Sequence, residues 1–494
     1  MGLADWVVIG LYVLLMGGIG VWAYSRVSGA EDFFAAGGKM PWWLSGISHH
    51  MSGYSGAVFV AHAGVAYTYG FSLYVWWALP ISFGILAGSF SIAPRWARLR
   101  IRLGMVSPME YLAMRYNVPT QQLMAWSGVL LKVFDVGAKW ASIAVILNVF
   151  AGVPLIYGIL ISGSISVFYI TLGGLWADVL TDLAQFVVQL GAAICLFWAV
   201  LMRLGGAGAL FSFWDRLPAA NHAWFNGPYT PVFSLAYLGI AFLSYNGGTW
   251  NLAQRFIASP SGSEARKAAL LSSALYLLWP LVLFFPMWAA PLFFPNLVDP
   301  TQSYSLMATR LLPPGLVGLV LASMFAHTMA MTTSDANTIA AVMTRDIFPV
   351  IVRKTRNLSE SQSLRLARVT TLIFTALTLV VAAEADRFGG VLSLLVIWFA
   401  ALVGPTAVPM ILGLLPVFRH CGAGAAVLSW VAGIATFAVT KYGMDPSMTT
   451  TLAAPVMVSA AVYIAGGLVR SSAPPPPSVV KLFDVLDGAS SHEK

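Results

Sequence analysis

The sequence predicts an all-α polytopic membrane protein, and three observations support that fold class. Hydrophobic residues make up 59% of the 494 residues and charged residues only 9%, a composition that soluble domains of this size do not have. Apolar runs of about 20 residues, the length that spans a bilayer, recur along the chain. Two of these runs contain clusters of glycine and polar residues at the depth of the membrane centre.

Hydropathy predicts about thirteen membrane-spanning segments. They cover residues 5–24, 42–66, 71–93, 121–151, 153–172, 178–202, 231–257, 266–293, 312–342, 366–384, 388–415, 422–440 and 450–469. After the last of them, a run of four prolines predicts a stiff polyproline spacer followed by a mobile end.

Basic residues in the connecting loops divide unequally between the two sides that these spans define. Most of them fall on one side, and the other side holds only Arg203, Arg216, Arg310, Arg387 and Lys441. The positive-inside rule makes the basic side cytoplasmic, so we expect an outside N-terminus and an inside C-terminus. The same rule explains the net charge of +8, and we expect membrane lipid and no nucleic acid as a partner.

A polar interruption divides the predicted span 42–66. Residues 48–56 read Ser-His-His-Met-Ser-Gly-Tyr-Ser-Gly. Hydrocarbon holds no water to satisfy backbone groups, so irregular backbone at this depth is tolerated only inside protein or beside a wet cavity. We therefore expect a broken helix whose freed carbonyls and amides form a binding site.

A second interruption lies in the span 231–257, where residues 245–251 read Tyr-Asn-Gly-Gly-Thr-Trp-Asn. A single glycine cluster is equally consistent with close helix packing. Two clusters in corresponding positions, both with polar neighbours, favour the substrate site of a transporter built from inverted repeats.

Several motifs resemble those of the sodium:solute symporter family, which includes sodium-coupled carriers of glucose, sialic acid, proline and pantothenate. The resemblance covers about residues 1–470. The motifs that carry it are Glu-Asp-Phe-Phe-Ala-Ala-Gly-Gly at 31–38, Pro-Trp-Trp at 41–43, Ser52-Gly53, Phe59, Gly64 to Gly70, Gly-Gly-Leu at 173–175, Thr-Asp-Leu-Ala-Gln at 181–185, Asn-Leu-Ala-Gln-Arg at 251–255 and Thr-Arg-Asp-Ile at 344–347.

This resemblance implies the LeuT-type fold, in which two inverted five-helix repeats follow one helix and precede two more. The implied division is a leading helix and loop at 1–41, a first repeat at 42–202, an extracellular loop at 203–230, a second repeat at 231–415, two trailing helices at 416–470 and a Pro-rich cytoplasmic tail at 471–494.

The resemblance also implies a sodium site common to the family. Its carbonyl ligands on the first broken helix correspond to Met51 and Tyr54. The positions on the eighth core helix are His327, Ala330 and Met331, where alanine and methionine offer no hard oxygen ligand. With this alignment of the eighth core helix, the sodium site lacks its hydroxyl ligands. An alignment shifted by one residue would supply a hydroxyl, because Thr328, Thr332, Thr333 and Ser334 are all close.

A second sodium site, present in some members of the family, corresponds to Asp182 with Thr333 and Ser334. Carboxylate and hydroxyl oxygens suit Na⁺, and carboxylates inside a membrane are functional by default. The alternative is that Asp182 only caps a helix or pairs with a neighbouring charge.

Histidines raise the alternative of proton coupling, because imidazole titrates near neutral pH. His327 and Asp335 lie eight residues apart, so they share one face of a predicted helix. His49, His50 and His62 lie on the first broken helix. For each histidine except His327, a neutral hydrogen-bonding group inside the bundle is the favoured explanation. His327 differs because it takes a position next to the expected cation site.

A charged segment lies within the predicted span 121–151. Asp135 and Lys139 are spaced i, i+4, with Lys132 one turn earlier, and the three charges leave one unpaired. The sialic acid carriers of the resembling family use a basic residue on this helix to hold a substrate carboxylate. We therefore hypothesise that Lys139 faces the substrate or the incomplete cation site.

Aromatic and amide side chains surround the expected substrate cavity. Stacking faces and amide groups of this kind suit sugars. The sugar carriers have hydroxyl-binding polar residues where this chain has Val58 and Trp77, which speaks against glucose or galactose. The expected substrate-binding residues are Ser52, Gly53, Val58, Trp76, Trp77, Lys139, Asn246, Thr249, Trp250 and Asn251.

These observations predict a secondary transporter of the bacterial inner membrane that carries a small polar solute, such as a sugar or sugar acid, by alternating access. We expect Na⁺ as the coupling ion, no organic cofactor and no other metal, and a monomer. Proton-coupled or uncoupled transport stays open, and so does a membrane-embedded sensor. An enzyme is not expected, because the sequence contains no catalytic motif such as H-E-x-x-H.

Overall fold

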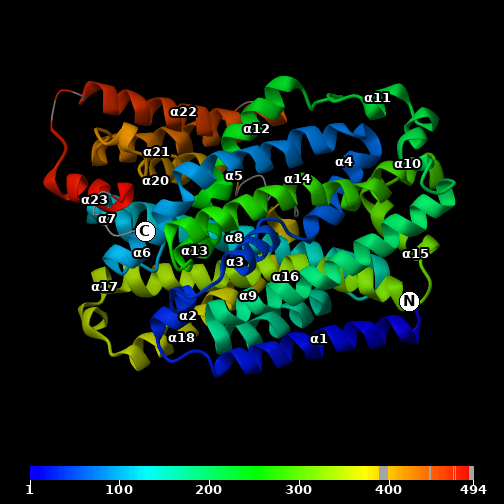
Figure 1. The fold of residues 1–494 in the computed structure, drawn as a ribbon, viewed down its shortest axis with the longest axis horizontal. Helices are drawn as coiled ribbons and strands as arrows, with labels where there is room; N and C mark the ends of the chain where they lie inside the picture. The colour runs from blue at the N-terminus through cyan, green and yellow to red at the C-terminus, as the bar shows by residue number, and fades with distance from the viewer. Residues whose placement is uncertain (389–398, 444–446, 471, 473, 489–494) are drawn as a thin grey trace.

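The computed structural model describes residues 1–388, 399–443, 447–470, 472 and 474–488. In these residues the chain is a bundle of helices joined by short loops, and most of the long helices run along one common direction (Figure 1). The all-α fold class predicted from the sequence is confirmed. Part of the predicted span 388–415 lies outside the described residues.

The long helices correspond closely to the predicted spans. They are α1 (Leu3–Tyr24), α8 (Val118–Ala151), α9 (Leu155–Leu204), α14 (Gly262–Phe293), α16 (Leu316–Val342), α18 (Glu360–Ala383), α21 (Ala423–Ala438) and α22 (Met448–Val469). Helix α9 joins two predicted spans, and its direction changes at Gly174, whose φ of 52° and ψ of −139° are not helical.

Among the described residues, eight helices are long and apolar enough to cross a membrane, or up to nine if the bent pair of α8 and the start of α9 is counted as a span. The broken helices escape this criterion because each piece is too short. The number of about thirteen spans and the orientation of the termini therefore stay predictions, and so do the boundaries of the repeats.

Both predicted breaks are present in the structure. The first span divides into α3 (Trp42–Met51), a 3₁₀ turn at Gly56–Phe59 and α4 (Ala61–Tyr69). The second divides into α12 (Pro231–Leu243), a π turn at Ser244–Gly248 and α13 (Asn251–Ile257).

Backbone angles in the second break explain its glycine. Gly247 has a φ of 119°, a conformation that L side chains rarely adopt. Trp250 also has a positive φ, of 70°, just before α13 begins. The chain leaves the helical path at these residues, which frees backbone groups at the centre of the bundle.

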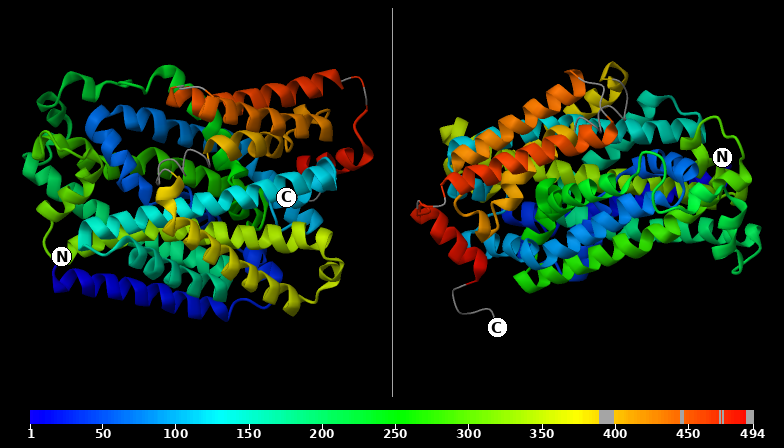
Figure 2. Two further views of the ribbon diagram at one scale, coloured as in Figure 1. Left: turned by 180° about the vertical axis from the view of Figure 1, so that it is seen from behind. Right: turned by 90° about the horizontal axis from the view of Figure 1, so that it is seen from above.

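Helix α16 lies at the centre of the molecule and α1 at its edge. Of the residues in the most apolar part of each helix, 89% are buried in α16 and 22% in α1. Helix α16 packs against α9, α8, α18 and α1, and α14 packs against α3 and α5 (Leu79–Ser91). Helices α21 and α22 pack on each other at the side of the bundle opposite α1 (Figures 1 and 2).

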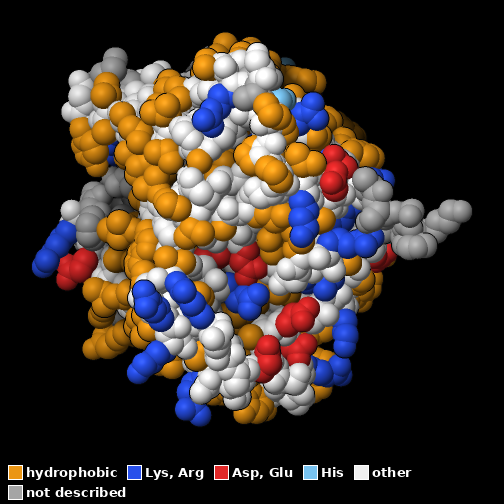
Figure 3. Space-filling model, turned by 90° about the vertical axis from the view of Figure 1, so that its left-hand side faces the viewer, with side chains coloured by type: hydrophobic (Ala, Val, Ile, Leu, Met, Phe, Trp, Pro, Cys, Tyr) orange, Lys and Arg blue, Asp and Glu red, His pale blue; other side chains and the backbone are white. Residues whose placement is uncertain are grey.

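One end of the bundle carries α6 (Ala93–Leu103), α7 (Glu110–Arg115), α17 (Phe348–Ile351) and α23 (Pro477–Asp487). Lys and Arg side chains gather on this end (Figure 3). The remaining short helices are α2 (Ala30–Ala35), α10 (Ala209–Ser212), α11 (Ala219–His222), α15 (Ser303–Leu311) and α20 (Val408–Leu412).

The expectation of a mobile end after the prolines is wrong for α23. This helix buries Val479, Leu482, Phe483 and Leu486, whose spacing places them on one face. That face packs against α6 and α7. The spacing of these apolar residues directly after the prolines was a usable sequence signal for an amphipathic helix.

Candidate functional site

The two helix breaks lie against each other in the middle of the bundle. The Tyr245 hydroxyl donates a hydrogen bond of 2.9 Å to the Gly53 carbonyl, and the Asn251 amide donates one of 3.0 Å to the Ser52 carbonyl. Carbonyls freed by the first break are therefore satisfied by side chains of the second. The predicted pairing of the two interruptions is present, and it joins Ser52, Gly53 and Asn251 of the expected substrate set.

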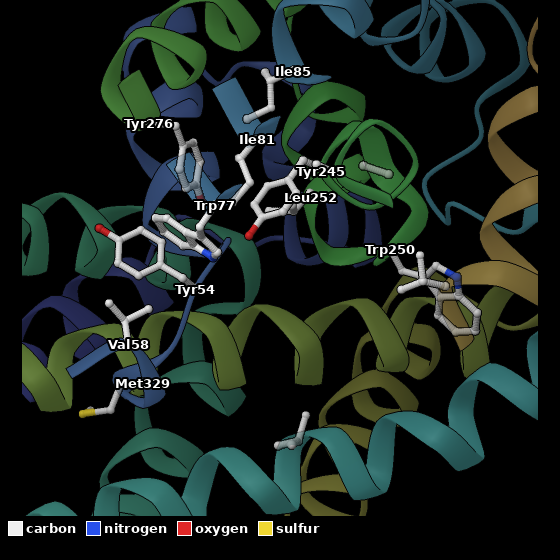
Figure 4. Packing of buried hydrophobic residues seen from close by; sticks show 14 of the residues in the cluster. Tyr54, Val58, Trp77, Ile81, Ile85, Tyr245, Trp250, Leu252, Tyr276 and Met329 are labelled. Atoms are coloured by element: carbon white, nitrogen blue, oxygen red, sulfur yellow. The ribbon is translucent and has the colours of Figure 1, made fainter. Parts of the chain in front are cut away.

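Aromatic rings cover this junction. Figure 4 shows Tyr54, Trp77, Tyr245 and Tyr276 gathered together. The Tyr54 ring centroid lies 5.7 Å from that of Trp77 and 5.8 Å from that of Tyr276, both in edge-to-face geometry. Val58 is buried below Tyr54 (Figure 4). Trp77 and Val58 of the expected substrate set thus belong to one packed aromatic and apolar cluster, called the aromatic lining of the junction below.

Other members of that expected set have different partners. Trp76 stacks on Tyr229 with ring centroids 4.9 Å apart, and the Asn246 amide donates to the carbonyls of Gly84 and Phe242. The Thr249 hydroxyl donates to the Ser244 carbonyl within its own break.

Trp250 lies apart from the aromatic lining (Figure 4). A Cβ atom added at Gly128 of α8 would overlap its indole ring, which shows how closely α8 approaches Trp250. Trp250 therefore packs the second break against α8.

Histidines on α3 and α4 contact neutral groups. His49 bonds through one ring nitrogen to the Ser272 hydroxyl at 2.7 Å and through the other to the Tyr245 carbonyl at 2.9 Å. His50 bonds to the Tyr54 hydroxyl at 3.1 Å, and His62 packs 4.9 Å from Trp77. These contacts agree with neutral histidines inside a packed bundle.

His327 and the first break are in direct contact. Its ring centroid lies 4.3 Å from that of Tyr54 and 5.4 Å from that of Phe59. The side chain is fully buried, and neither ring nitrogen has a hydrogen-bond partner among the described residues. Asp335, two turns further along α16, has charged partners on α8 instead.

The Thr328 hydroxyl of α16 contacts the first break, although the sequence register did not assign Thr328 to the expected common sodium site. Met51 ends α3, and both Met51 and Tyr54 are buried. On α16, the Thr328 hydroxyl accepts a hydrogen bond of 3.1 Å from the Gly56 amide, so it faces the first break. Ala330 and Met331 are buried on the same helix and have no hydroxyl. Thr328 is therefore an oxygen that α16 presents beside the first break.

A charged cluster, called the arginine triad below, consists of Arg255, Asp178 and Asp182. The Nη2 atom of Arg255 lies 2.6 Å from Asp178 Oδ2 and 3.3 Å from Asp182 Oδ2. Helix α13 brings the guanidinium to the two carboxylates of α9. All three side chains have no exposed surface.

Four hydroxyl residues surround the arginine triad and connect it to the first break and to α16. Ser48 of α3 donates to Asp182 at 2.6 Å, and Thr333 donates to Asp178 at 2.6 Å. Ser52 accepts from Arg255 at 2.9 Å and lies 2.9 Å from the Ser334 hydroxyl. The predicted hydroxyls of Thr333 and Ser334 therefore bond to Asp178, and Ser52 connects Ser334 to Asp182. Asp178 and Arg255 are additional members of this cluster.

Sequence reasoning missed those two residues for different reasons. Asp178 lies one helical turn before Asp182, so the i, i+4 spacing was a usable signal. Arg255 lies in a motif that the family resemblance already included, yet its partners are 73 and 77 residues away in sequence. No local pattern predicts such a contact.

A second charged cluster, called the lysine quartet, consists of Lys132, Asp135, Lys139 and Asp335. Lys139 Nζ lies 2.6 Å from Asp135 Oδ2 and 2.7 Å from Asp335 Oδ2. Lys132 also pairs with Asp335, and its Nζ lies 3.8 Å from Asp135 Oδ2. The expectation that one of three charges stays unpaired is wrong, because α16 packs against α8 and supplies Asp335 as the fourth charge.

Comparison with known proteins gives consistent results along the chain. The sequence pattern of the sodium:solute symporter family matches residues 33–433. The sodium/sialic acid symporter of Proteus mirabilis is 24% identical over 468 residues, covering 90% of each chain. The human sodium/iodide cotransporter is 29% identical over 460 residues, covering 87% of this chain and 70% of the human protein.

Solved structures give the same fold. A sodium-coupled sialic acid symporter, solved in a substrate-bound outward-open state, superposes with a TM-score of 0.83 at 20% identity over 96% of this chain and 99% of that one. A nucleobase-cation-symport-1 family transporter superposes with a TM-score of 0.59 over 92% of this chain and 98% of that one. The similarity supports the expected LeuT-type architecture.

Proposed function

Because the chain belongs to the sodium:solute symporter family, we propose that it couples the entry of Na⁺ to uptake of a small polar solute by alternating access. As a member of this family it is a multi-pass membrane transporter and not an enzyme. One observation carries the proposal: the two helix breaks meet beside buried oxygen ligands that suit a hard monovalent cation.

The cation position that we propose is centred on Asp182, with the hydroxyls of Ser52, Thr333 and Ser334 nearby. A carboxylate and hydroxyl groups form the kind of oxygen-donor set that Na⁺ accepts. This position connects α3, α9 and α16. An ion bound there stabilises the conformation in which those three elements are in contact. Because the ion binds this conformation more tightly than one in which the elements are apart, ion binding shifts the conformational equilibrium toward it.

The proposed substrate position lies at the junction of the breaks, under Tyr54, Trp77 and Tyr276. Aromatic faces and nearby amide and hydroxyl groups suit a sugar or sugar acid. The sialic acid symporter relatives support a sugar acid. Relatives that carry iodide or a monocarboxylate extend the proposal to other small anions.

Lys139 is the residue that the sequence-based hypothesis assigns to binding a substrate carboxylate. Its ammonium is held by Asp135 and Asp335, which neutralise it. If it binds substrate, one of these carboxylates must give way to the carboxylate of the solute. We keep Lys139 as a proposed residue of the site, and the Lys139→Met variant tests it through the KM for an acidic solute.

The decisive experiment measures uptake into proteoliposomes with the sodium gradient and the proton gradient imposed separately. Radiolabelled sialic acid is the first solute, followed by glucose, iodide and a monocarboxylate. Uptake driven by an inward Na⁺ gradient at uniform pH supports the proposal. Uptake driven only by a proton gradient establishes the proton-coupled alternative, and equilibration that responds to neither gradient establishes an uncoupled carrier.

A further inference from the structure

Charge does not balance in the arginine triad. Asp178 and Asp182 contribute two negative charges and Arg255 one positive charge, and none of the three is exposed. Among the described residues, Arg255 is the one Lys or Arg side chain within ion-pair distance of either carboxylate. The other polar contacts are neutral hydroxyls. An uncompensated buried charge is unfavourable, and the triad becomes neutral when it takes up one more monovalent cation, either Na⁺ or a proton on a carboxylate.

The contacts show which carboxylate carries the surplus charge. Arg255 Nη2 is 2.6 Å from Asp178 and 3.3 Å from Asp182, so the guanidinium is paired more closely with Asp178. Both oxygens of Asp178 are used, Oδ1 by Thr333 and Oδ2 by Arg255 and Ser334.

Asp182 is different, because its Oδ1 atom is buried without a hydrogen-bond partner among the described residues. The surplus negative charge and the open ligand position therefore coincide on Asp182.

We propose that Asp178 determines cation binding without touching the ion, by holding Arg255 and so keeping Asp182 negatively charged toward the site. This inference rests on the proposed function and adds a positioning residue to it. If Asp178 lost its charge, Arg255 would pair with Asp182, which is already 3.3 Å away. The triad would then be neutral, and it would have no electrostatic reason to take up Na⁺.

The arrangement also explains why the cation acts on both breaks. Arg255 belongs to α13, which follows the second break, and it bonds to Ser48 and Ser52 at the first. Its partners on the other side are Asp178 on α9 and Ser334 on α16. A cation that completes the charge of the triad therefore stabilises all four elements in one arrangement.

The test measures binding of radioactive ²²Na⁺ to the purified full-length protein in detergent, using Asp178→Asn and the double variant Asp178→Asn/Arg255→Gln. The single variant should lower Na⁺ affinity at least about tenfold, the factor that 1.4 kcal/mol produces. The double variant restores the net charge of −1 and should recover most of the affinity. A purely structural role for Asp178 would leave the double variant as weak as the single one or weaker.

Controls separate charge from geometry. Thr333→Val removes the hydroxyl on Asp178 Oδ1 and keeps the charge, whereas Thr332→Val removes a hydroxyl that donates only along its own helix. Thr332→Val should bind Na⁺ like the wild type, and Thr333→Val should lose less affinity than Asp178→Asn. Size-exclusion chromatography reports folding, and Asp178→Ser replaces Asp178→Asn if that variant aggregates.

The outcomes distinguish this inference from the proposed function. If the wild type binds no ²²Na⁺, or if Asp182→Asn binds it unchanged, the proposed sodium site itself is wrong. If Asp182→Asn abolishes binding while folded Asp178→Asn keeps it, the sodium site stands and the role of Asp178 is overturned. Equal loss in the single and double variants of Asp178 also overturns that role.

Discussion

The lysine quartet and the arginine triad are both buried, and both contact α16 through adjacent residues, yet they differ in charge. Asp335 pairs with the two lysines of α8, and Ser334 bonds to Arg255 and Asp178. The quartet has two positive and two negative charges, whereas the triad has one positive and two negative charges. A balanced cluster has no surplus charge, whereas the surplus negative charge of the triad is removed by a bound cation or by protonation of a carboxylate.

Helical geometry explains how adjacent residues serve such different clusters. Consecutive residues point about 100° apart around a helix with 3.6 residues per turn. Asp335 therefore faces α8 while Ser334 faces α9 and α13. The comparison separates two kinds of charged cluster inside this bundle: one that is balanced and holds helices together, and one that carries the surplus charge on which the proposed cation site rests.

The largest predicted loss of stability results from disrupting the quartet. Asp335→Asn leaves two buried ammonium groups with one carboxylate, so we expect about 3–5 kcal/mol of lost stability. Thermal unfolding in detergent, followed by tryptophan fluorescence, measures it. The loss should be the same in NaCl and in choline chloride, since the charges of the quartet balance and we expect it to bind no sodium.

A matched double variant checks the cause. Lys139→Met with Asp335→Leu removes one charge of each sign and leaves Lys132 beside Asp135. This variant should recover most of the lost stability, because apolar residues of similar volume replace a buried ion pair at little cost. A double variant as unstable as Asp335→Asn would contradict the charge argument.

The next largest effect is expected when the triad is disrupted, and its size should depend on the sodium concentration. Arg255→Gln leaves two buried carboxylates without their guanidinium, so the unfolding temperature should fall strongly in choline chloride. Sodium binds the native state and should reverse part of the fall by mass action. A decrease of equal size in both salts would show that the triad does not bind the ion.

A smaller effect is predicted for the hydroxyl that joins the first break to the triad. The Ser48 hydroxyl donates to Asp182 at 2.6 Å and accepts from Arg255 Nε at 3.0 Å. Hydrogen bonds to charged groups contribute about 1.5–3 kcal/mol, and Ser48→Ala should lose that much. Ser89→Ala is the control, because within the described part of the chain its buried hydroxyl bonds only to Leu86 of the same helix. Equal losses of stability in Ser48→Ala and Ser89→Ala would show that the bonds of Ser48 to the triad add no special stabilisation.

The smallest effect concerns an ion pair at the surface. Arg95 and Asp487 lie 2.6 Å apart with side chains 14% and 41% exposed. Such pairs contribute about 0.2–1 kcal/mol, so Asp487→Asn should barely change the unfolding temperature. Hydrogen exchange of α23 should rise slightly, and high salt should reduce the difference between variant and wild type. A loss of stability as large as that of Asp335→Asn would show that burial does not determine how much each ion pair contributes to stability.

The breaks were predictable because glycine and polar residues within an apolar span leave few other interpretations. The site around them was only partly predictable. Asp182, Thr333 and Ser334 were predicted from the family resemblance; Thr333 and Ser334 bond to Asp178, and Ser52 connects Ser334 to Asp182. Gly53 and Asn251 were placed correctly at the junction, since both belong to the interruptions themselves.

The remaining residues depend on contacts between distant parts of the chain. Lys139 and Asp335 are 196 residues apart, so the charge balance of α8 was not visible in its own sequence. Trp76, Asn246 and Trp250 have the residue types of a sugar site, but residue type does not determine which neighbour a side chain faces. Thr328 was considered only as an error of register, yet it is the α16 hydroxyl that contacts the first break.

The docking of α23 also has a consequence for how the chain is made. Arg95 contacts Asp487 across 392 residues of sequence, and Arg98 contacts the Leu486 carbonyl across 388. A ribosome must therefore add 392 residues after Arg95 before this arginine can meet Asp487. Until then, the arginines of α6 lack the partners that α23 gives them in the finished fold.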